Sequence, residues 1–161
     1  MRISVRKAIG AMSVGATCLM LGACTLVLAP TLDLDEAKST VWQIEDELLA
    51  RVPREAVVTR WPRTETSSLT AACDSGGASW HGVAWLDVTP ELDRQAFIHE
   101  VAEEWNQRDG WQARAFDDPL FALLRSPGGY ELSIFFADET FTVATWTPCI
   151  NIPDYSPYEE Y

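Results

Sequence analysis

The chain has 161 residues, 47% of them hydrophobic, which is enough for one domain with a sizeable core. Its 24 acidic and 12 basic residues give a net charge of −12 at pH 7. Because nucleic acids are bound through neutralised phosphates, a chain this acidic is repelled by DNA and RNA, and the composition argues against a nucleic-acid partner.

Residues 1–23 predict a secretory signal peptide. Arg2, Arg6 and Lys7 precede a run from residue 8 to residue 23 that contains no charged residue. This run is too short for a permanent membrane span. Removing its three basic residues lowers the net charge from −12 to −15.

The segment Leu21-Gly22-Ala23-Cys24 resembles the lipobox of bacterial lipoproteins, in which one aliphatic and two small residues precede an acylated cysteine. The resemblance implies cleavage before Cys24, lipid on that residue, and a place on the extracytoplasmic face of the cell membrane. Lipid chains bury methylenes worth about 0.8 kcal/mol each, so such an anchor needs no transmembrane helix. Two alternatives are an ordinary secreted protein with Cys24 as its first cysteine, and processing at Cys18, a poorer site.

A tether is predicted over residues 24–32, followed by a single α+β domain over residues 33–150. The domain opens with an amphipathic helix in which Asp33 and Glu36 are spaced as a capping box and Pro53 ends the pattern. The apolar positions of this helix recur at steps of three and four: Leu34, Ala37, Val41, Ile44, Leu48 and Val52.

Alternating and β-branched residues then predict three strands: Val57–Trp61, Leu69–Cys73 and Trp80–Val88. A second helix is predicted from Thr89-Pro90, a cap followed by a first-turn proline, to Gly110. Its apolar stripe contains Leu92, Ala96, Phe97, Val101 and Trp105.

The second helix contains the sequence His-Glu-Val-Ala-Glu at residues 99–103, similar to the HExxH motif of zinc peptidases. Two histidines one turn apart hold zinc in that motif, whereas Glu103 replaces the second histidine here and none follows. We therefore interpret Glu100, Glu103 and Glu104 as a solvated helix face, and we expect neither a metal ion nor a cofactor.

Four strands are predicted after the second helix: Trp111–Phe116, Leu120–Arg125, Tyr130–Phe136 and Thr140–Thr147. Short turns at residues 127–129 and 138–139 join the last three into an antiparallel meander. The predicted fold class is α+β, an antiparallel sheet with a C-terminal β-meander packed against two α-helices. Residues 151–161 form an acidic tail rich in tyrosine and proline.

Two cysteines remain if Cys18 is removed and Cys24 is acylated. An even pair in an exported chain predicts a disulfide between Cys73 and Cys149. Their separation is unlike a CxxC redox or zinc motif. Two free thiols are the alternative.

A hairpin centred on residues 138–139 pairs residues whose numbers sum to 277. The core face then carries these pairs: Phe136 with Phe141, Ile134 with Val143, and Leu132 with Thr145. The opposite face carries Glu131, Ser133, Phe135, Thr142, Ala144 and Trp146. Because polar and small groups there surround two large rings, we expect Phe135 and Trp146 to line a half-wet groove for an apolar ligand or a partner segment. A small cluster beneath a loop or beneath residues 155–161 is the alternative.

In its layout the chain resembles the small Lpp-type (LppA-like) lipoproteins of actinobacteria. The shared features are the lipobox, the Cys73-Asp74-Ser75-Gly76-Gly77 segment, a strand with tryptophan, a second helix that ends near residues 110–111, and a final meander followed by a cysteine. The resemblance spans most of the chain after residue 23. It implies an envelope location and a compact α+β domain, and it implies no catalytic or ligand-binding residue.

These features favour a membrane-anchored extracytoplasmic binding or interaction module. Its expected partners are the membrane, through Cys24, and an envelope protein or a small apolar ligand. One alternative is an envelope hydrolase that uses scattered carboxylates, and another is a structural or assembly factor. A hydrolase predicts a cleft with convergent carboxylates of perturbed pKa, whereas a binding module predicts a concave aromatic face.

Overall fold

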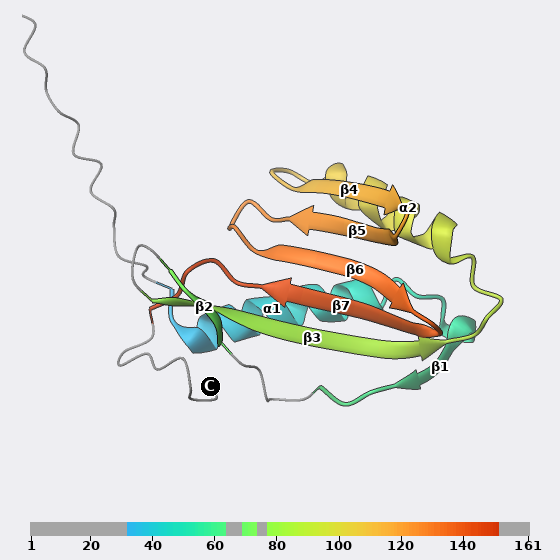
Figure 1. Ribbon diagram of the computed structural model, residues 1–161, viewed down its shortest axis with the longest axis horizontal. Coiled ribbons are helices and arrows are strands. Elements are labelled where there is room, and N and C mark those ends of the chain that lie inside the picture. Colours follow the sequence, from blue (N-terminus) through green and yellow to red (C-terminus); the bar gives the residue numbers. More distant parts are fainter. Residues whose placement is uncertain (1–31, 64–68, 74–76, 152–161) are drawn as a thin grey trace, which may run out of the picture.

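The computed structural model of the chain describes residues 32–63, 69–73 and 77–151 (Figure 1). Cys24, the predicted signal peptide and most of the predicted tether lie outside these residues, as do residues 152–161 of the predicted tail. The elements, in chain order, are α1 (Leu34–Leu49), η1 (Arg54–Ala56), β1 (Val57–Arg60), β2 (Leu69–Ala72), β3 (Ala78–Val88), α2 (Arg94–Asn106), β4 (Gln112–Asp117), β5 (Leu120–Arg125), β6 (Glu131–Ala137) and β7 (Thr140–Trp146).

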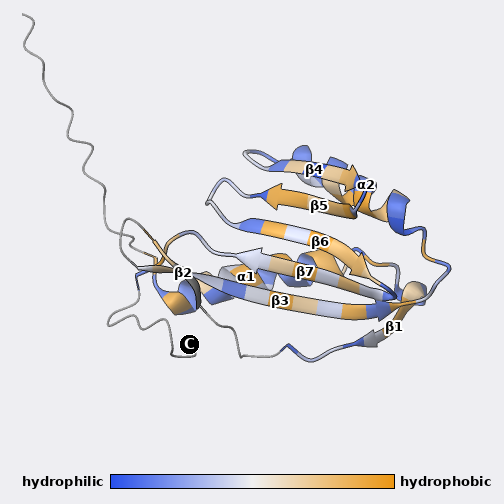
Figure 2. Ribbon diagram, viewed as in Figure 1, coloured by the Kyte–Doolittle hydropathy of each residue, from blue (hydrophilic) through white to orange (hydrophobic). Residues whose placement is uncertain are grey.

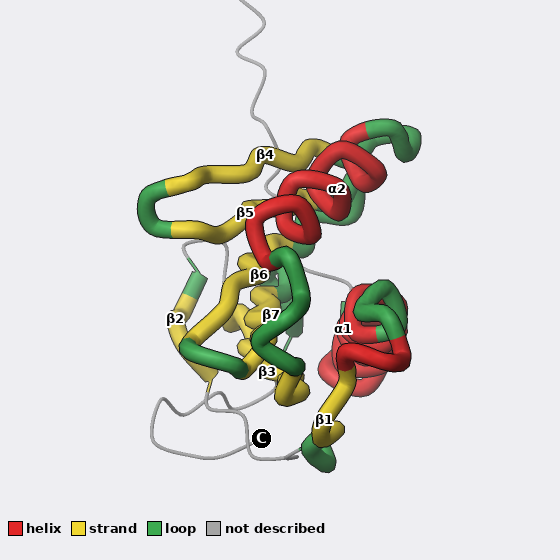
Figure 3. The backbone as a smooth tube through the Cα atoms, turned by 90° about the vertical axis from the view of Figure 1, so that its right-hand side faces the viewer, coloured by secondary structure: helices red, strands yellow, loops and turns green. Residues whose placement is uncertain are grey.

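The strands form one antiparallel sheet in the order β1-β3-β7-β6-β5-β4, and β2 pairs with the first residues of β3. The predicted meander is confirmed, and it extends from β4 to β7. Both helices pack on the same face of the sheet, α1 against β3 and β7, and α2 mainly against β4 and β5 (Figure 3). The fold is therefore α+β, as the sequence predicted.

The predicted register of the last hairpin is confirmed. Phe136 lies opposite Phe141 and Ile134 lies opposite Val143. In β3, buried residues alternate strictly with half-buried ones, so the two faces of the sheet are clearly distinguished. We call the face that neither α1 nor α2 covers the outer face.

Helix α1 begins where the sequence predicts, because Asp33 Oδ1 accepts a hydrogen bond from the backbone N–H of Glu36 at 2.8 Å. It ends at Leu49 rather than Val52. The last residues tighten into a turn in which the N–H of Val52 donates to the carbonyl of Leu49.

The predicted start of the second helix at Thr89 is wrong. Helix α2 is capped by Asp93, whose Oδ1 accepts a hydrogen bond from the N–H of Ala96 at 3.0 Å. The N–H of Thr89 instead donates to the carbonyl of Ala56. The buried face of α2 includes Ile98, while Ala96, placed in the predicted stripe, is exposed.

The predicted disulfide is present. Cys73 and Cys149 are bonded, with their Cα atoms 6.1 Å apart and a sequence separation of 76. The bond joins the segment after β2 to the segment after β7, beside a backbone bridge between Ala78 and Ile150. No helix among the described residues has the length and apolar composition needed to cross a bilayer.

Candidate binding face on the open side of the sheet

Side chains on the outer face line up in three rows that run across the strands. The first, which we call the aromatic row, contains Trp85, Thr142, Phe135, Phe121 and Phe116. The middle row contains Val83, Ala144, Ser133, Leu123 and Arg114. The third row contains His81, Trp146, Glu131, Arg125 and Gln112. Because side chains directly opposite on adjacent strands touch, each row is a continuous strip.

Rings in the two flanking rows stack on each other across neighbouring strands. The centroids of Phe116 and Phe121 are 4.5 Å apart with 7° between the ring planes. Those of His81 and Trp146 are 4.7 Å apart with 29° between planes. Since adjacent strands are about 4.8 Å apart, rings stacked in this way stand upright on the sheet and present their edges outward.

The two stacked pairs lie in different flanking rows, Phe116 and Phe121 on β4 and β5, and His81 and Trp146 on β3 and β7. The flanking rows are four residues apart along each strand, which is about 13 Å at 3.4 Å per residue. Ala144 and Ser133, both short, lie between the rows, and the exposed Leu123 follows them in the middle row.

Two open hollows lie along β5, and one of them is lined by Leu123, whose exposed fraction is 47%. One, of about 320 Å³, is lined in part by Phe121, Ser133 and Phe135. The other, of about 370 Å³, is lined by Leu123 and by three charged residues: Arg114, Arg125 and Glu131. The outer face is thus furrowed rather than flat.

Charges on the outer face lie at its margins. The guanidinium of Arg114 sits 4.7 Å from the ring centre of Phe116 and forms no ion pair with any residue that the structure describes. Arg125 is ion-paired with Glu131. Burial lowers the pKa of His81, which favours its neutral form. The centre of the face, from Ser133 to Ala144, carries no charge.

The strand β5 explains why this face is so apolar. Its sequence is hydrophobic at every position except its final arginine, and Figure 2 shows it hydrophobic along most of its length. Such a run is typical of a strand buried on both faces. In this fold α2 covers one face only, so Phe121 and Leu123 point away from the helices.

The two aromatic residues singled out from the sequence, Phe135 and Trp146, both lie on the outer face. They belong to different groups, because Phe135 is in the aromatic row whereas Trp146 stacks on His81. The sequence prediction missed Phe116, Phe121 and Leu123, since it considered only the last hairpin. The alternation of β5 in register with β6 could have identified them.

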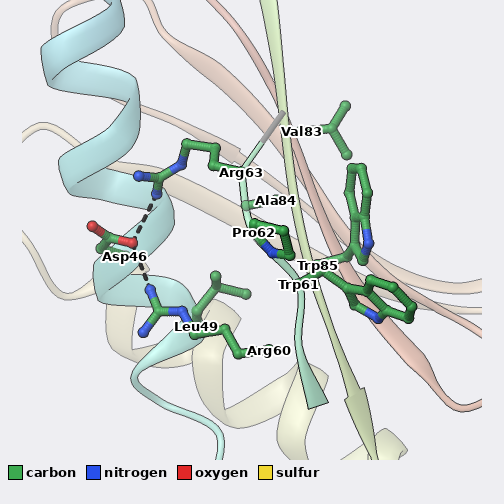
Figure 4. A pocket seen from close by; sticks show the side chains of 9 residues that line it. All are labelled: Asp46, Leu49, Arg60, Trp61, Pro62, Arg63, Val83, Ala84 and Trp85. Carbon is green, nitrogen blue, oxygen red and sulfur yellow. Dashed lines mark hydrogen bonds and ion pairs between the residues drawn. The ribbon is translucent and has the colours of Figure 1, made fainter. Parts of the chain in front are cut away.

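A separate cavity of about 380 Å³ lies beside the segment after β1 (Figure 4). Arg60 and Arg63 both reach the same oxygen of Asp46 on α1, at 2.8 and 2.7 Å. Trp61 projects to the other side of this segment, next to Trp85 (Figure 4). The two arginines therefore fasten residues 60–63 to α1.

Beside Arg63, which lines this cavity, lies a carboxyl group that the sequence prediction missed. The side chain of Glu45 is 1% exposed, and its Oε2 lies 3.2 Å from Nε of Arg63. Burial raises the pKa of Glu45 to about 7, against the opposing effect of the Arg63 charge. Because Glu45 is sealed from solvent, it is not placed to contact a substrate.

The His99 segment is engaged with a neighbouring strand. His99 Nε2 lies 2.7 Å from Oδ1 of Asp117 on β4, which lowers the pKa of Asp117. Glu104 was predicted to be solvated, which is wrong: it is half-buried and ion-paired with Arg51 and Arg108. Within the described ranges, no group of three or more His, Cys, Asp or Glu side chains could hold a metal ion.

Comparison with known proteins adds no relative. No family model matches the sequence, and neither a curated protein nor a solved structure is detectably similar to it.

Proposed function

We propose that the protein is an extracytoplasmic lipoprotein, anchored to the cell membrane through Cys24, whose domain binds a partner on the outer face. The observation that carries this proposal is the aromatic row, with Trp85, Phe135, Phe121 and Phe116, on the face of the sheet that neither α1 nor α2 covers. Large contiguous apolar surface is rare on monomeric proteins and marks interaction sites.

The composition of the outer face supports binding. A sheet with helices on one side ordinarily turns polar residues toward water on the other. Here the centre lacks charge, while Arg114 and Arg125 lie at the margin. Protein interfaces share this arrangement of aromatic residues and arginine around a charge-poor centre.

A lipid on Cys24 would hold the domain close to the membrane. Leu32 is already fixed to the fold, because its carbonyl accepts a hydrogen bond from the N–H of Asn151. Leu32 follows Cys24 by eight residue steps, and a fully extended chain of this length reaches about 27 Å. Repulsion between the acidic domain and anionic head groups would keep the domain off the membrane surface, with its outer face accessible.

The hydrolase alternative has less support. Among the described residues, Glu45 is the carboxyl group whose pKa is raised, and it is enclosed by the core and paired with Arg63. A general acid must reach its substrate to within hydrogen-bonding distance. Glu45 does not meet this condition.

A photo-crosslinking residue tests the binding role in cells. Placed at Leu123, which is exposed on the outer face, it should give discrete adducts on illumination. The matched control carries the photo-crosslinking residue in place of Glu100, which is exposed on α2. Adducts at neither position, or equally at both, would refute a binding role for the outer face.

The anchor is tested by Cys24→Ala, which removes the thiol that would be acylated. We expect this variant to leave the detergent-rich phase in a two-phase partition experiment, whereas the unaltered protein stays in it, because lipid chains supply the partition energy. Replacing the nearby Cys18 by alanine is the control and should not change partitioning. Retention of the Cys24 variant in the detergent phase would exclude the proposed anchor.

A further inference from the structure

We propose that the free edge of β4, where it runs beside α2, binds an extended basic segment of a partner protein as an additional antiparallel strand of the sheet. This site lies at the edge of the sheet and is separate from the outer face, so it goes beyond the proposed function. Three observations support it: backbone groups that face the free edge, a hollow beside them, and an acidic side chain in that hollow with no ion-pair partner among the described residues.

Strand β4 ends the sheet, and among the described strands it pairs only with β5. The N–H of Ala113 points away from β5, because it donates to Oδ1 of Asn106 on α2 at 3.2 Å. Backbone groups two residues apart in a strand point the same way, so the N–H and C=O of Ala115 also face the free edge. The alternation along β5 agrees, since the N–H of Ser126 at its end donates to the carbonyl of Tyr130, on the side of β6.

The edge of β4 lacks the features that usually prevent strand addition, such as a bulge or a proline. The strand keeps a continuous register with β5 along its whole length and contains no proline. Its charged side chains leave this stretch of the edge open, because Arg114 lies on the outer face and Asp117, at the far end, is held by His99. The edge is therefore accessible to the backbone of an extended peptide.

An open hollow of about 340 Å³ lies between this edge and α2, which runs beside β4 (Figure 3). Its lining consists of Ala113 and Ala115 from β4 and of His99, Ala102, Glu103 and Asn106 from α2. In strand addition, backbone hydrogen bonds supply affinity and pockets for alternate side chains supply specificity. The three alanines leave room for such a side chain on the face of the added strand that is turned toward α2.

The Asn106 side chain shows which chemical group this edge accepts. Its amide oxygen occupies the position from which the carbonyl of an added strand would accept the hydrogen bond of Ala113. Asn106 is exposed, so its side chain can turn aside when a peptide carbonyl replaces it. A peptide group is therefore a chemical match for the edge.

The charge of the hollow favours a basic partner. Glu103 is exposed within it and forms no ion pair with any residue that the structure describes. A lysine or arginine opposite Ala115 would project toward α2 and could pair with Glu103. The net charge of −12 steers a basic segment toward the chain and repels a second copy of it.

The test uses the full chain, purified in a non-ionic detergent, and the peptide acetyl-Lys-Val-Lys-Val-Lys-amide as the probe. In an extended strand its three lysines project from one face. Fluorescence anisotropy of a labelled peptide measures affinity, and amide NMR spectra of the isotopically labelled chain locate the site. We expect saturable binding of one peptide per chain, with the largest amide shifts at Ala113 and Ala115.

Two matched peptides separate strand addition from attraction between opposite charges. Methylation of the backbone nitrogen of the central lysine keeps every charge but removes the N–H that would donate to the carbonyl of Ala115. Binding should become at least about tenfold weaker, because a hydrogen bond is lost and the methyl group clashes with the edge. The same sequence with glutamate in place of lysine keeps the backbone and should bind much more weakly than the lysine peptide.

Three variants of the chain test the two sides of the hollow. Ala115→Pro removes an N–H that faces the free edge, where a strand tolerates proline, and should weaken binding at least about tenfold. Glu103→Gln should weaken binding of the lysine peptide about two- to fivefold, as expected for an exposed ion pair. Glu100→Gln removes the same charge at an exposed position of α2 outside the hollow and should leave binding unchanged.

The proposal is overturned if the lysine peptide does not bind saturably, if its methylated form binds equally well, or if the amide shifts fall around Ser133 and Ala144 on the outer face. A dimer joined at β4 in the absence of peptide, detected by sedimentation velocity, would assign the edge to a second copy and reject the partner segment. Cross-links from residue 123 test the outer face separately, so either site can fail without the other.

Discussion

At the scale of single residues, the most consequential pair is Glu45 and Gly82. Gly82 lies on the core face of β3, opposite Thr145 on β7. A Cβ atom at Gly82 would lie 2.8 Å from Glu45 Oε1 and within 3.0 Å of the Trp80 ring. The missing side chain therefore provides the space that the buried carboxyl group and the indole fill.

Gly82→Ala should accordingly destabilise the domain. We expect a loss of about 1–3 kcal/mol in the free energy of unfolding, the usual cost of overpacking a core, measured by urea denaturation. Gly128→Ala is the control, since a Cβ there meets nothing closer than 3.4 Å. Equal effects of the two substitutions would contradict the tight contact at Gly82.

Glu45 should make stability depend on pH. Burial raises its pKa from 4.5 to about 7, so between these values the folded chain holds a proton that the unfolded chain releases. The stability that this adds is fully present below pH 4.5 and is lost as the pH rises through about 7. From the size of the shift, the loss is about 3 kcal/mol.

Glu45→Gln removes this titration while keeping the shape of the side chain. Urea denaturation at a series of pH values should show that the decline in stability between pH 4.5 and pH 8 is much smaller in the variant. Asp117→Asn is the control, because the lowered pKa of Asp117 affects stability only at more acidic pH. The same slope in Glu45→Gln as in the unaltered chain would show that Glu45 is not the group responsible.

At the scale of elements, the N-terminus of α2 shows that a sequence pattern typical of a helix start need not be the one at which the helix begins. Thr89-Pro90 has the composition of a helix start, but Asp93 accepts the capping hydrogen bond. The N–H of Thr89 is instead held by the segment before β1. A long-range hydrogen bond thus displaces the start by four residues.

Asp93→Ala should cost about 1 kcal/mol, the usual value for loss of an N-cap side chain. Thr89→Ser keeps a hydroxyl at the start that the sequence predicted and should change stability by less than half as much. Thermal unfolding of both variants, followed by circular dichroism, makes the comparison. A larger loss for Thr89→Ser would place the functional cap at residue 89.

At the scale of the whole molecule, the decisive feature is that both described helices cover the same face of a broad sheet, and neither covers the other face (Figure 3). Neighbouring residues in one strand therefore have opposite roles. Ile134 is fully buried beneath the helices, and Phe135 is half-buried on the outer face.

Replacing each of these neighbours by serine tests the distinction. Ile134→Ser should cost at least about 3 kcal/mol, because it leaves a cavity and a hydroxyl in the core. Phe135→Ser should cost about 1 kcal/mol or less and should keep a cooperative thermal transition. If Phe135→Ser proved as destabilising as Ile134→Ser, the outer face would be a second core, and the proposal that it binds a partner would be refuted.

Local patterns in the sequence determined much of the architecture. Alternation within strands predicted the fold class, the hairpin register and strand ends within two residues of those observed. The expected export of the chain, together with the even number of cysteines left after processing, predicted the Cys73–Cys149 bond. These features depend on near neighbours or on pairing across a short turn, so a local pattern is sufficient to specify them.

Only the tertiary structure decided which surfaces meet. The spacing of α1 places position 45 on the buried stripe, four residues after Val41, but a glutamate can occupy it only because Gly82 leaves room and Arg63 lies beside the carboxyl group, and both lie far away in sequence. The aromatic row likewise gathers Trp85, Phe135 and Phe116 from strands that become neighbours only when the sheet closes. Local spacing fixes which way a side chain points, whereas the packing of both helices on one face decides whether it meets a core or solvent.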